Sequence, residues 1–185
     1  IIKEYKKKGF YCVSRIVTFK DAVFAMENPN ESLTDHNGNL VVYNDQYWPS
    51  AYSRKAWMYN VELAKECADL GFNEIQFDYV RFPDGTASAN SKLNFHNTYK
   101  ESKVAAIQSF LQYAKEELSP KCVYVAADMF AWPIVACDDQ DIGQFLPAIA
   151  NVVDIICPMP YLDHFSNGRA QCDRKSSPIL CKRME

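Results

Sequence analysis

Short apolar runs separated by polar segments recur along the whole chain. Four of these runs are rich in β-branched and aromatic residues, a composition typical of strands, and they cover residues 11–19, 74–80, 123–130 and 154–161. Their lengths suit strands that cross a sheet once. The pattern therefore predicts four strands spread over most of the sequence.

Longer segments with apolar residues at helical spacing lie between the strands. Ser53 is predicted to cap a helix that ends before Gly71, a residue suited to the left-handed position after a helix. Thr98 and Glu101 form a capping-box pattern that predicts the start of a second helix. Asp141 is the predicted N-cap of a short third helix. Strands and helices thus alternate.

This alternation predicts parallel strands joined by helical crossovers, either in an open doubly wound sheet or in a barrel. The long polar segments, 20–52 and 82–97, follow strands, whereas the segments after helices are short. That asymmetry favours a barrel, and no glycine-rich phosphate loop supports the alternative. We expect an α/β fold of the (β/α)8 TIM-barrel type, incomplete with about four to six βα units, over residues 1–165, and a divergent tail at 166–185.

Polar residues on two of these strands are the first candidates for catalysis. Side chains alternate along a strand, so Gln76 and Asp78 share one face while Ile75 and Phe77 share the other. The third strand repeats this pattern and ends near Asp128. Two carboxylates at the ends of neighbouring strands suit glycosidic bond cleavage, in which one protonates the leaving oxygen and the other attacks or stabilises the anomeric carbon.

A buried carboxylate is costly without a partner, so Asp78 is expected to contact an arginine, and Arg15 and Arg81 are the nearby candidates. We expect Arg81 and Gln76 to hold Asp78 as the general acid/base, with Asp128 as the second carboxylate, although the two aspartates are interchangeable at this level. Glu74 begins its strand, at the end of a barrel that serves stability, where an ion pair is expected.

Residues in the loops that follow strands are candidates for sugar binding. Aromatic rings offer flat apolar surfaces to sugar faces, and a lysine or histidine offers hydrogen bonds. Each of these residues has a structural alternative, as a packing aromatic or a loop anchor. The candidates are Lys20, Tyr47, Trp48, Trp132, Tyr161 and His164.

Composition narrows the classes of partner. The net charge is −3, from 20 basic and 23 acidic residues mixed along the chain, so no basic patch predicts nucleic-acid or membrane binding. The 3 histidines lack metal-ligand spacing and the 7 cysteines form no CxxC pair, so neither a metal nor a cofactor is expected. Cys12, Cys122 and Cys157 lie in or beside strand-like runs and are expected to be small buried residues. No signal-peptide pattern opens the chain.

The run GFNEIQFDYVRFPDG at 71–85 resembles the bacterial putative glycosyl hydrolase domain typified by GFDEIQFDYVRFP. RIVTFKDAVFA before it, and AADMF, DIGQ and VDIICPMPYLDHF after it, extend the resemblance over about residues 10–165 in the same order. It implies a TIM-type barrel of the glycosidase kind that acts on or binds polysaccharide, in the cell envelope or secreted. The family's opening and last strands have no counterpart here, and the segment 159–165 departs from the family pattern.

Three functions stay open from the sequence. The first is a glycoside hydrolase that acts on a carbohydrate substrate. The second is a carbohydrate-binding domain on the same scaffold without catalysis. The third is a barrel fragment that associates with another copy through its open edges, because exposed strand edges invite pairing.

Overall fold

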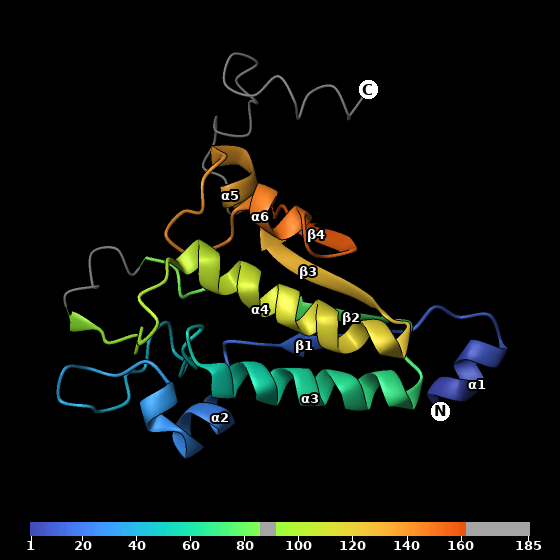
Figure 1. Ribbon diagram of the computed structural model, residues 1–185, viewed down its shortest axis with the longest axis horizontal. Coiled ribbons are helices and arrows are strands. Elements are labelled where there is room, and N and C mark those ends of the chain that lie inside the picture. Colours follow the sequence, from blue (N-terminus) through green and yellow to red (C-terminus); the bar gives the residue numbers. More distant parts are fainter. Residues whose placement is uncertain (86–91, 162–185) are drawn as a thin grey trace, which may run out of the picture.

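A single parallel sheet organises the computed structural model, which describes residues 1–85 and 92–161. The strands pair in the order in which they occur along the chain, and every neighbouring pair is parallel. They are β1 (Val13–Val17), β2 (Glu74–Asp78), β3 (Tyr124–Phe130) and β4 (Ile155–Met159). The predicted succession of parallel strands with crossovers is confirmed (Figure 1).

Two long helices, α3 (Arg54–Leu70) and α4 (Lys103–Leu118), lie side by side and form the crossovers between β1 and β2 and between β2 and β3 (Figure 1). Shorter helices flank them or occupy the loops. These are α1 (Ile2–Lys7), α2 (Ala22–Glu27), η1 (Pro29–Glu31), η4 (Ser119–Lys121), α5 (Ala131–Ala136) and α6 (Leu146–Ala150). The sequence pattern predicted neither α2 nor α5, because each has only 6 residues, fewer than two helical turns, and is too short to show a repeating apolar period.

The core lies between the sheet and the two long helices. Phe110 of α4 is fully buried, and its ring centroid lies 5.3 Å from that of Phe77, 5.1 Å from Phe19 and 5.9 Å from Trp57. Edge-on contacts of this kind add to the free energy gained from burying apolar surface. The helices therefore cover the sheet face that carries Phe77, as the alternation along β2 predicted.

The opposite face of the sheet is open. Val13 and Val17 of β1 are each 40% exposed and Tyr124 of β3 is 55% exposed, and all three lie on the face of Asp78. In a closed barrel this face lines the interior and is filled by side chains from further strands. The described residues thus form part of a barrel, with β1 and β4 as its two free edges.

Two predicted helix ends are confirmed and two are wrong. The Ser53 side chain accepts a hydrogen bond from the Ala56 amide at 3.0 Å, and Gly71 ends α3 with φ +103°. By contrast, α4 is capped by Ser102 rather than by Thr98, because the Asn97 side chain closes its own turn with the backbone of residue 101.

The predicted N-cap at Asp141 is also wrong. Asp141 has φ +58° and forms an ion pair with Lys103 at 2.9 Å, while α6 begins only after Phe145. In both cases hydrogen bonds or ion pairs made by the loop take the place of the expected cap.

The cysteine prediction is wrong for Cys122, which is exposed, and Cys12 and Cys157 are only partly buried. Cys122 has φ +56° in the turn before β3, and Cys157 faces the open side of the sheet, opposite Asp128 in the strand register. The predicted tail at 166–185 and the candidate His164 lie outside the described residues.

Gly143 brings the loop before α6 against α4. It has φ +80°, and a Cβ added there would lie 2.8 Å from both the Lys103 carbonyl oxygen and Ile107 Cγ1. Gly38 has a similar φ of +85° but has no atom within 4 Å of such a Cβ. Comparing alanine substitutions at the two glycines therefore separates the cost of backbone strain from the cost of steric overlap.

We predict that Gly143→Ala lowers the free energy of unfolding by about 2–4 kcal/mol, as the sum of left-handed strain and overpacking. Gly38→Ala should lower it by only about 1 kcal/mol, because strain acts alone there. Urea denaturation of both variants measures the difference. Equal losses would show that the loop does not pack against α4 in this way.

Candidate functional site

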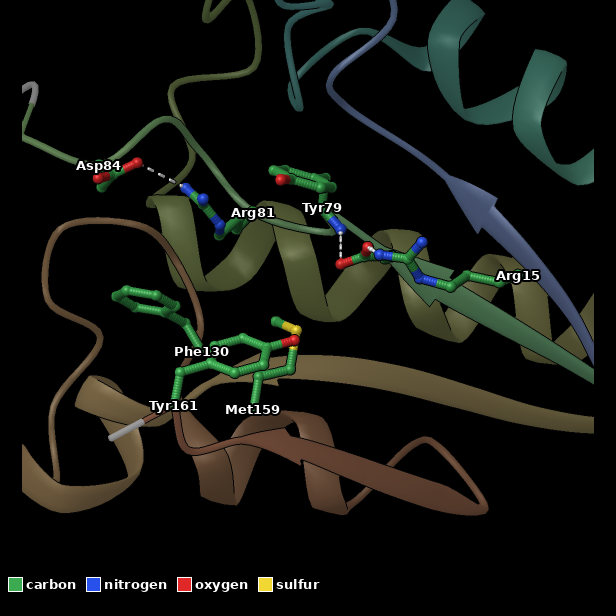
Figure 2. Close-up of a pocket in the computed structure, with 8 residues that line it drawn as sticks. Arg15, Tyr79, Arg81, Asp84, Phe130, Met159 and Tyr161 are labelled. Atoms are coloured by element: carbon green, nitrogen blue, oxygen red, sulfur yellow. Dashed lines mark hydrogen bonds and ion pairs between the residues drawn. The ribbon is translucent and has the colours of Figure 1, made fainter. Parts of the chain in front are cut away.

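The carboxyl ends of the parallel strands meet at one edge of the sheet and surround a cavity of about 480 Å³. Strand ends are where barrels of this type carry their functional residues. Figure 2 shows the side chains around the cavity, with polar groups from β1 and β2 on one side and apolar groups from β3 and β4 on the other. The lining residues are Arg15, Asp78, Tyr79, Arg81, Asp84, Phe130, Met159 and Tyr161.

Asp78 is 1% exposed, and both of its carboxylate oxygens are occupied. Oδ1 accepts a hydrogen bond from the Tyr79 amide at 2.7 Å, and Oδ2 forms an ion pair with the Arg15 guanidinium. Tyr79 has φ +48°, which is rare for a bulky residue and turns the chain sharply at the end of β2. This turn presents the Tyr79 amide to the carboxylate that precedes it.

Asp128 is 3% exposed and lies beside Asp78 on the neighbouring strand. Its Oδ1 accepts a hydrogen bond from the Gln76 amide, and its Oδ2 lies 3.5 Å from Arg15 Nε. Burial, together with the negative charge of Asp78, raises the pKa of Asp128, although the Gln76 hydrogen bond and Arg15 act in the opposite direction. The two predicted carboxylates are thus brought together through Arg15, but in different electrostatic settings.

Arg81 does not hold Asp78, which corrects the expectation from sequence. Its guanidinium forms an ion pair with Asp84 at 3.1 Å and donates to the Phe82 carbonyl at 3.0 Å. Gln76 likewise contacts Asp128 rather than Asp78. Arg81 turns to partners within three residues of it in the loop after β2, whereas Gln76 reaches across to β3.

Trp48 is 2% exposed, so its ring belongs to the core and offers no free face to a sugar. Its indole N–H donates to the Tyr43 carbonyl at 2.8 Å, and its ring packs edge-on against Tyr79 with centroids 6.0 Å apart. Lys20 lies over the Tyr79 ring, with Nζ 4.7 Å from the centroid. Trp48 therefore supports the cavity wall from behind.

The remaining candidates divide between the cavity and its surroundings. Tyr161 lines the cavity and is 53% exposed. Tyr47 and Trp132 are partly buried, and neither is among the cavity-lining residues.

Sequence reasoning missed several residues that shape the site. Phe130 and Met159 form its apolar side, and Asp84 holds Arg81. Gln144 is fully buried, accepts from the Phe130 amide at 2.8 Å and donates to the Asp128 carbonyl at 2.9 Å. The only signal for Gln144 was its place in the DIGQ motif, which gave no indication of a contact with β3.

Glu74 lies at the opposite end of the sheet from the cavity and is 6% exposed. It accepts a hydrogen bond from the Tyr11 hydroxyl at 2.8 Å, and no basic side chain in residues 1–85 or 92–161 forms an ion pair with it. Burial, followed by this hydrogen bond, raises the pKa of Tyr11 to about 12. The ion pair that was expected at Glu74 is thus replaced by a hydrogen bond from the neutral Tyr11 hydroxyl.

No cluster of histidine, cysteine or acidic side chains suited to a metal ion occurs within the part of the chain that the structure describes. Over the same residues, none of the helices has the length and apolar character needed to cross a membrane.

Solved structures with a similar fold include enzymes that act on sugars. A maltogenic α-amylase from Thermotoga neapolitana matches with a TM-score of 0.57 and 15% identity, over 85% of this chain and 30% of that one. The glycoside hydrolase domain of PelA from Pseudomonas aeruginosa matches with a TM-score of 0.53 and 10% identity, over 85% of this chain and 53% of that one. At such identities the likeness establishes the fold, which is part of a TIM barrel.

A hypothetical protein from Ruminiclostridium thermocellum is 34% identical, with a TM-score of 0.60 over 69% of this chain and 63% of that one. The chain therefore spans less than two thirds of this relative. No curated protein matches. The model of a family described as "Putative glycosyl hydrolase domain" matches residues 1–179, and the chain belongs to this family.

Proposed function

We propose that this chain carries the catalytic carboxylates of a glycoside hydrolase that cleaves O-glycosyl bonds in a polysaccharide. The observation that supports it most is the pair of buried aspartates, Asp78 and Asp128, on adjacent strands at the mouth of the cavity. Glycosidases of most families use two such carboxyl groups on either side of the scissile bond. Family membership supports the same class of reaction.

In this proposal Asp128 is the general acid and Asp78 is the charged partner, the reverse of the assignment favoured from sequence. A general acid must keep its proton near the working pH, and the raised pKa of Asp128 suits that role. Asp78 is held by a hydrogen bond from the Tyr79 amide and an ion pair with Arg15, and in this proposal it attacks or stabilises the anomeric carbon.

The cavity provides the two kinds of surface that a sugar needs. Phe130, Met159 and Tyr161 form an apolar side for the ring face, while Arg81 and Asp84 offer polar groups to its hydroxyls. Lys20 lies beyond Tyr79, at the rim, where we propose that it contacts a neighbouring sugar unit.

Release of reducing ends from a panel of bacterial and plant polysaccharides tests the proposed hydrolysis. Asp78→Asn and Asp128→Asn should each reduce release by about 10²–10⁴-fold, because each removes one of the two groups that act on the bond. Asp69→Asn is the matched control, since Asp69 pairs with Lys121 on the exposed surface. It should release sugar at the wild-type rate.

Absence of release by the wild-type chain on every polysaccharide would contradict the hydrolase proposal. If a polysaccharide nevertheless retained the chain, and Asp78→Asn weakened that retention, carbohydrate binding without cleavage would replace it. A dimer with the sheet continued across β1 and β4 would instead support completion of the barrel by a second copy.

The raised pKa of Asp128 also predicts how the stability of Asp128→Asn changes with pH. Between the ordinary Asp pKa of 3.8 and its raised value, the folded chain holds the Asp128 proton and the unfolded chain does not. Stability from this group is therefore complete at low pH and is lost as pH rises through the raised pKa. Asparagine cannot ionise, so the unfolding free energy of Asp128→Asn should rise relative to that of wild type as pH increases from the ordinary Asp pKa of 3.8 through the raised pKa of Asp128.

Urea denaturation across this range gives the difference between the two proteins at each pH. Asp69→Asn serves again as control, and its difference from wild type should not rise in the same way. A difference for Asp128→Asn that stays flat or falls would mean that the pKa of Asp128 is not raised in the folded chain.

A further inference from the structure

We propose that Arg15 is a positioning residue that joins the two carboxylates of the site, through a close ion pair with Asp78 and a longer one with Asp128. This assignment rests on the proposed hydrolase function. Arg15 lies on β1, two residues before the strand ends at Val17, and it pairs in register with Gln76 of β2. Figure 2 shows its side chain reaching from β1 toward the Asp78 carboxylate.

The contacts of the Arg15 guanidinium are unequal. Nη2 forms a close ion pair with Asp78 Oδ2, whereas Nε lies 3.5 Å from Asp128 Oδ2. An arginine carries a permanent charge on a planar group with donors on two edges, so it can contact both carboxylates without losing its proton. Because Coulomb energy falls with distance, Arg15 interacts more strongly with Asp78 than with Asp128.

The other groups around the pair act on Asp128 in opposing senses. Asp78 faces Asp128 from β2, and its negative charge opposes a second charge on Asp128. The Cys157 thiol faces Asp128 from β4, and the hydrogen bond from Gln76 only partly offsets burial. Arg15 is the one described cation that forms an ion pair with either carboxylate. Arg15 and Gln76 therefore only partly offset burial and the charge of Asp78, which raise the pKa of Asp128.

The Arg15 side chain is far more exposed to solvent than the two carboxylates that it contacts. Its side chain is 56% exposed, while those of Asp78 and Asp128 are only 2% and 4% exposed. The guanidinium thus covers the pair from the open side of the sheet, and no other part of the core depends on it. Replacing Arg15 should change the charge balance of the pair with little effect on packing.

The test uses the whole chain with ¹³C-labelled aspartate and follows the side-chain carboxyl signals by NMR as pH changes. Asp78→Asn and Asp128→Asn assign the two signals. In Arg15→Gln, the titration midpoint of Asp128 should move upward, because a positive charge that opposes protonation is removed. Arg15→Lys keeps the positive charge but lacks the second donor edge of the guanidinium. The Asp128 titration midpoint in this variant should therefore lie between the midpoints in Arg15→Gln and in wild type.

Kinetics provide the second readout. If Arg15 positions the pair, Arg15→Gln should lower kcat by about 10–100-fold with little change in KM, and Arg15→Lys should recover part of the loss. Lys121→Gln is the control for loss of one positive charge, since Lys121 pairs with Asp69 and precedes β3 at the other end of the sheet. It should match wild type in both readouts.

An unchanged Asp128 titration in folded Arg15→Gln, checked by circular dichroism, would overturn the proposal whatever the activity. A kcat equal to that of wild type would do the same. If the titration moves but wild type cleaves no polysaccharide, the hydrolase function fails while the bridging role of Arg15 stands.

Discussion

The in-register parallel pairing of β1 to β4 is the constraint on which the rest of the structure depends. Because successive side chains point to opposite faces, this pairing sorts every strand residue into one of two environments. Phe77 and its neighbours meet the long helices, and Gln76, Asp78 and Asp128 meet one another. A slip of one residue in β2 would place Asp78 in the apolar core and Phe77 in the cavity.

Burying two carboxylates side by side opposes folding, and the site contains the interactions that offset this cost. Each aspartate has one oxygen fixed by an N–H donor, from the Tyr79 backbone or the Gln76 side chain, and Arg15 lies against the other oxygen of both. The arrangement is unequal, because Arg15 lies closer to Asp78 than to Asp128. Burial and the neighbouring charge of Asp78 raise the pKa of Asp128.

Loops after the strands complete the site through buried contacts rather than exposed ones. The Gln144 amide joins the end of β3 to the loop that precedes α6, and Gly143 permits the close approach to α4 that this contact requires. Trp48 and Lys20 support Tyr79 from the first long loop. A cavity made in this way is held by the same packing that holds the core.

Local rules were enough to identify features whose cause lies within a few residues. Ser53 and Gly71 bound α3 as expected, since a cap and a left-handed turn depend only on nearby backbone. The alternation along β2 also placed Asp78 and Phe77 on the correct faces. Thr98 and Asp141 failed as caps because neighbouring loops used other hydrogen bonds.

The sequence by itself determined the order of strands and helices, the faces of each strand and the presence of carboxylates at two strand ends. The tertiary structure alone decided that Arg15 joins Asp78 to Asp128 and that Gln76 contacts Asp128. Periodicity is a local property of the chain, whereas these pairings depend on which side chains the parallel register brings within a few ångströms of each other. Partners such as Arg15 and Asp78, 63 residues apart in sequence, meet only after the strands have paired.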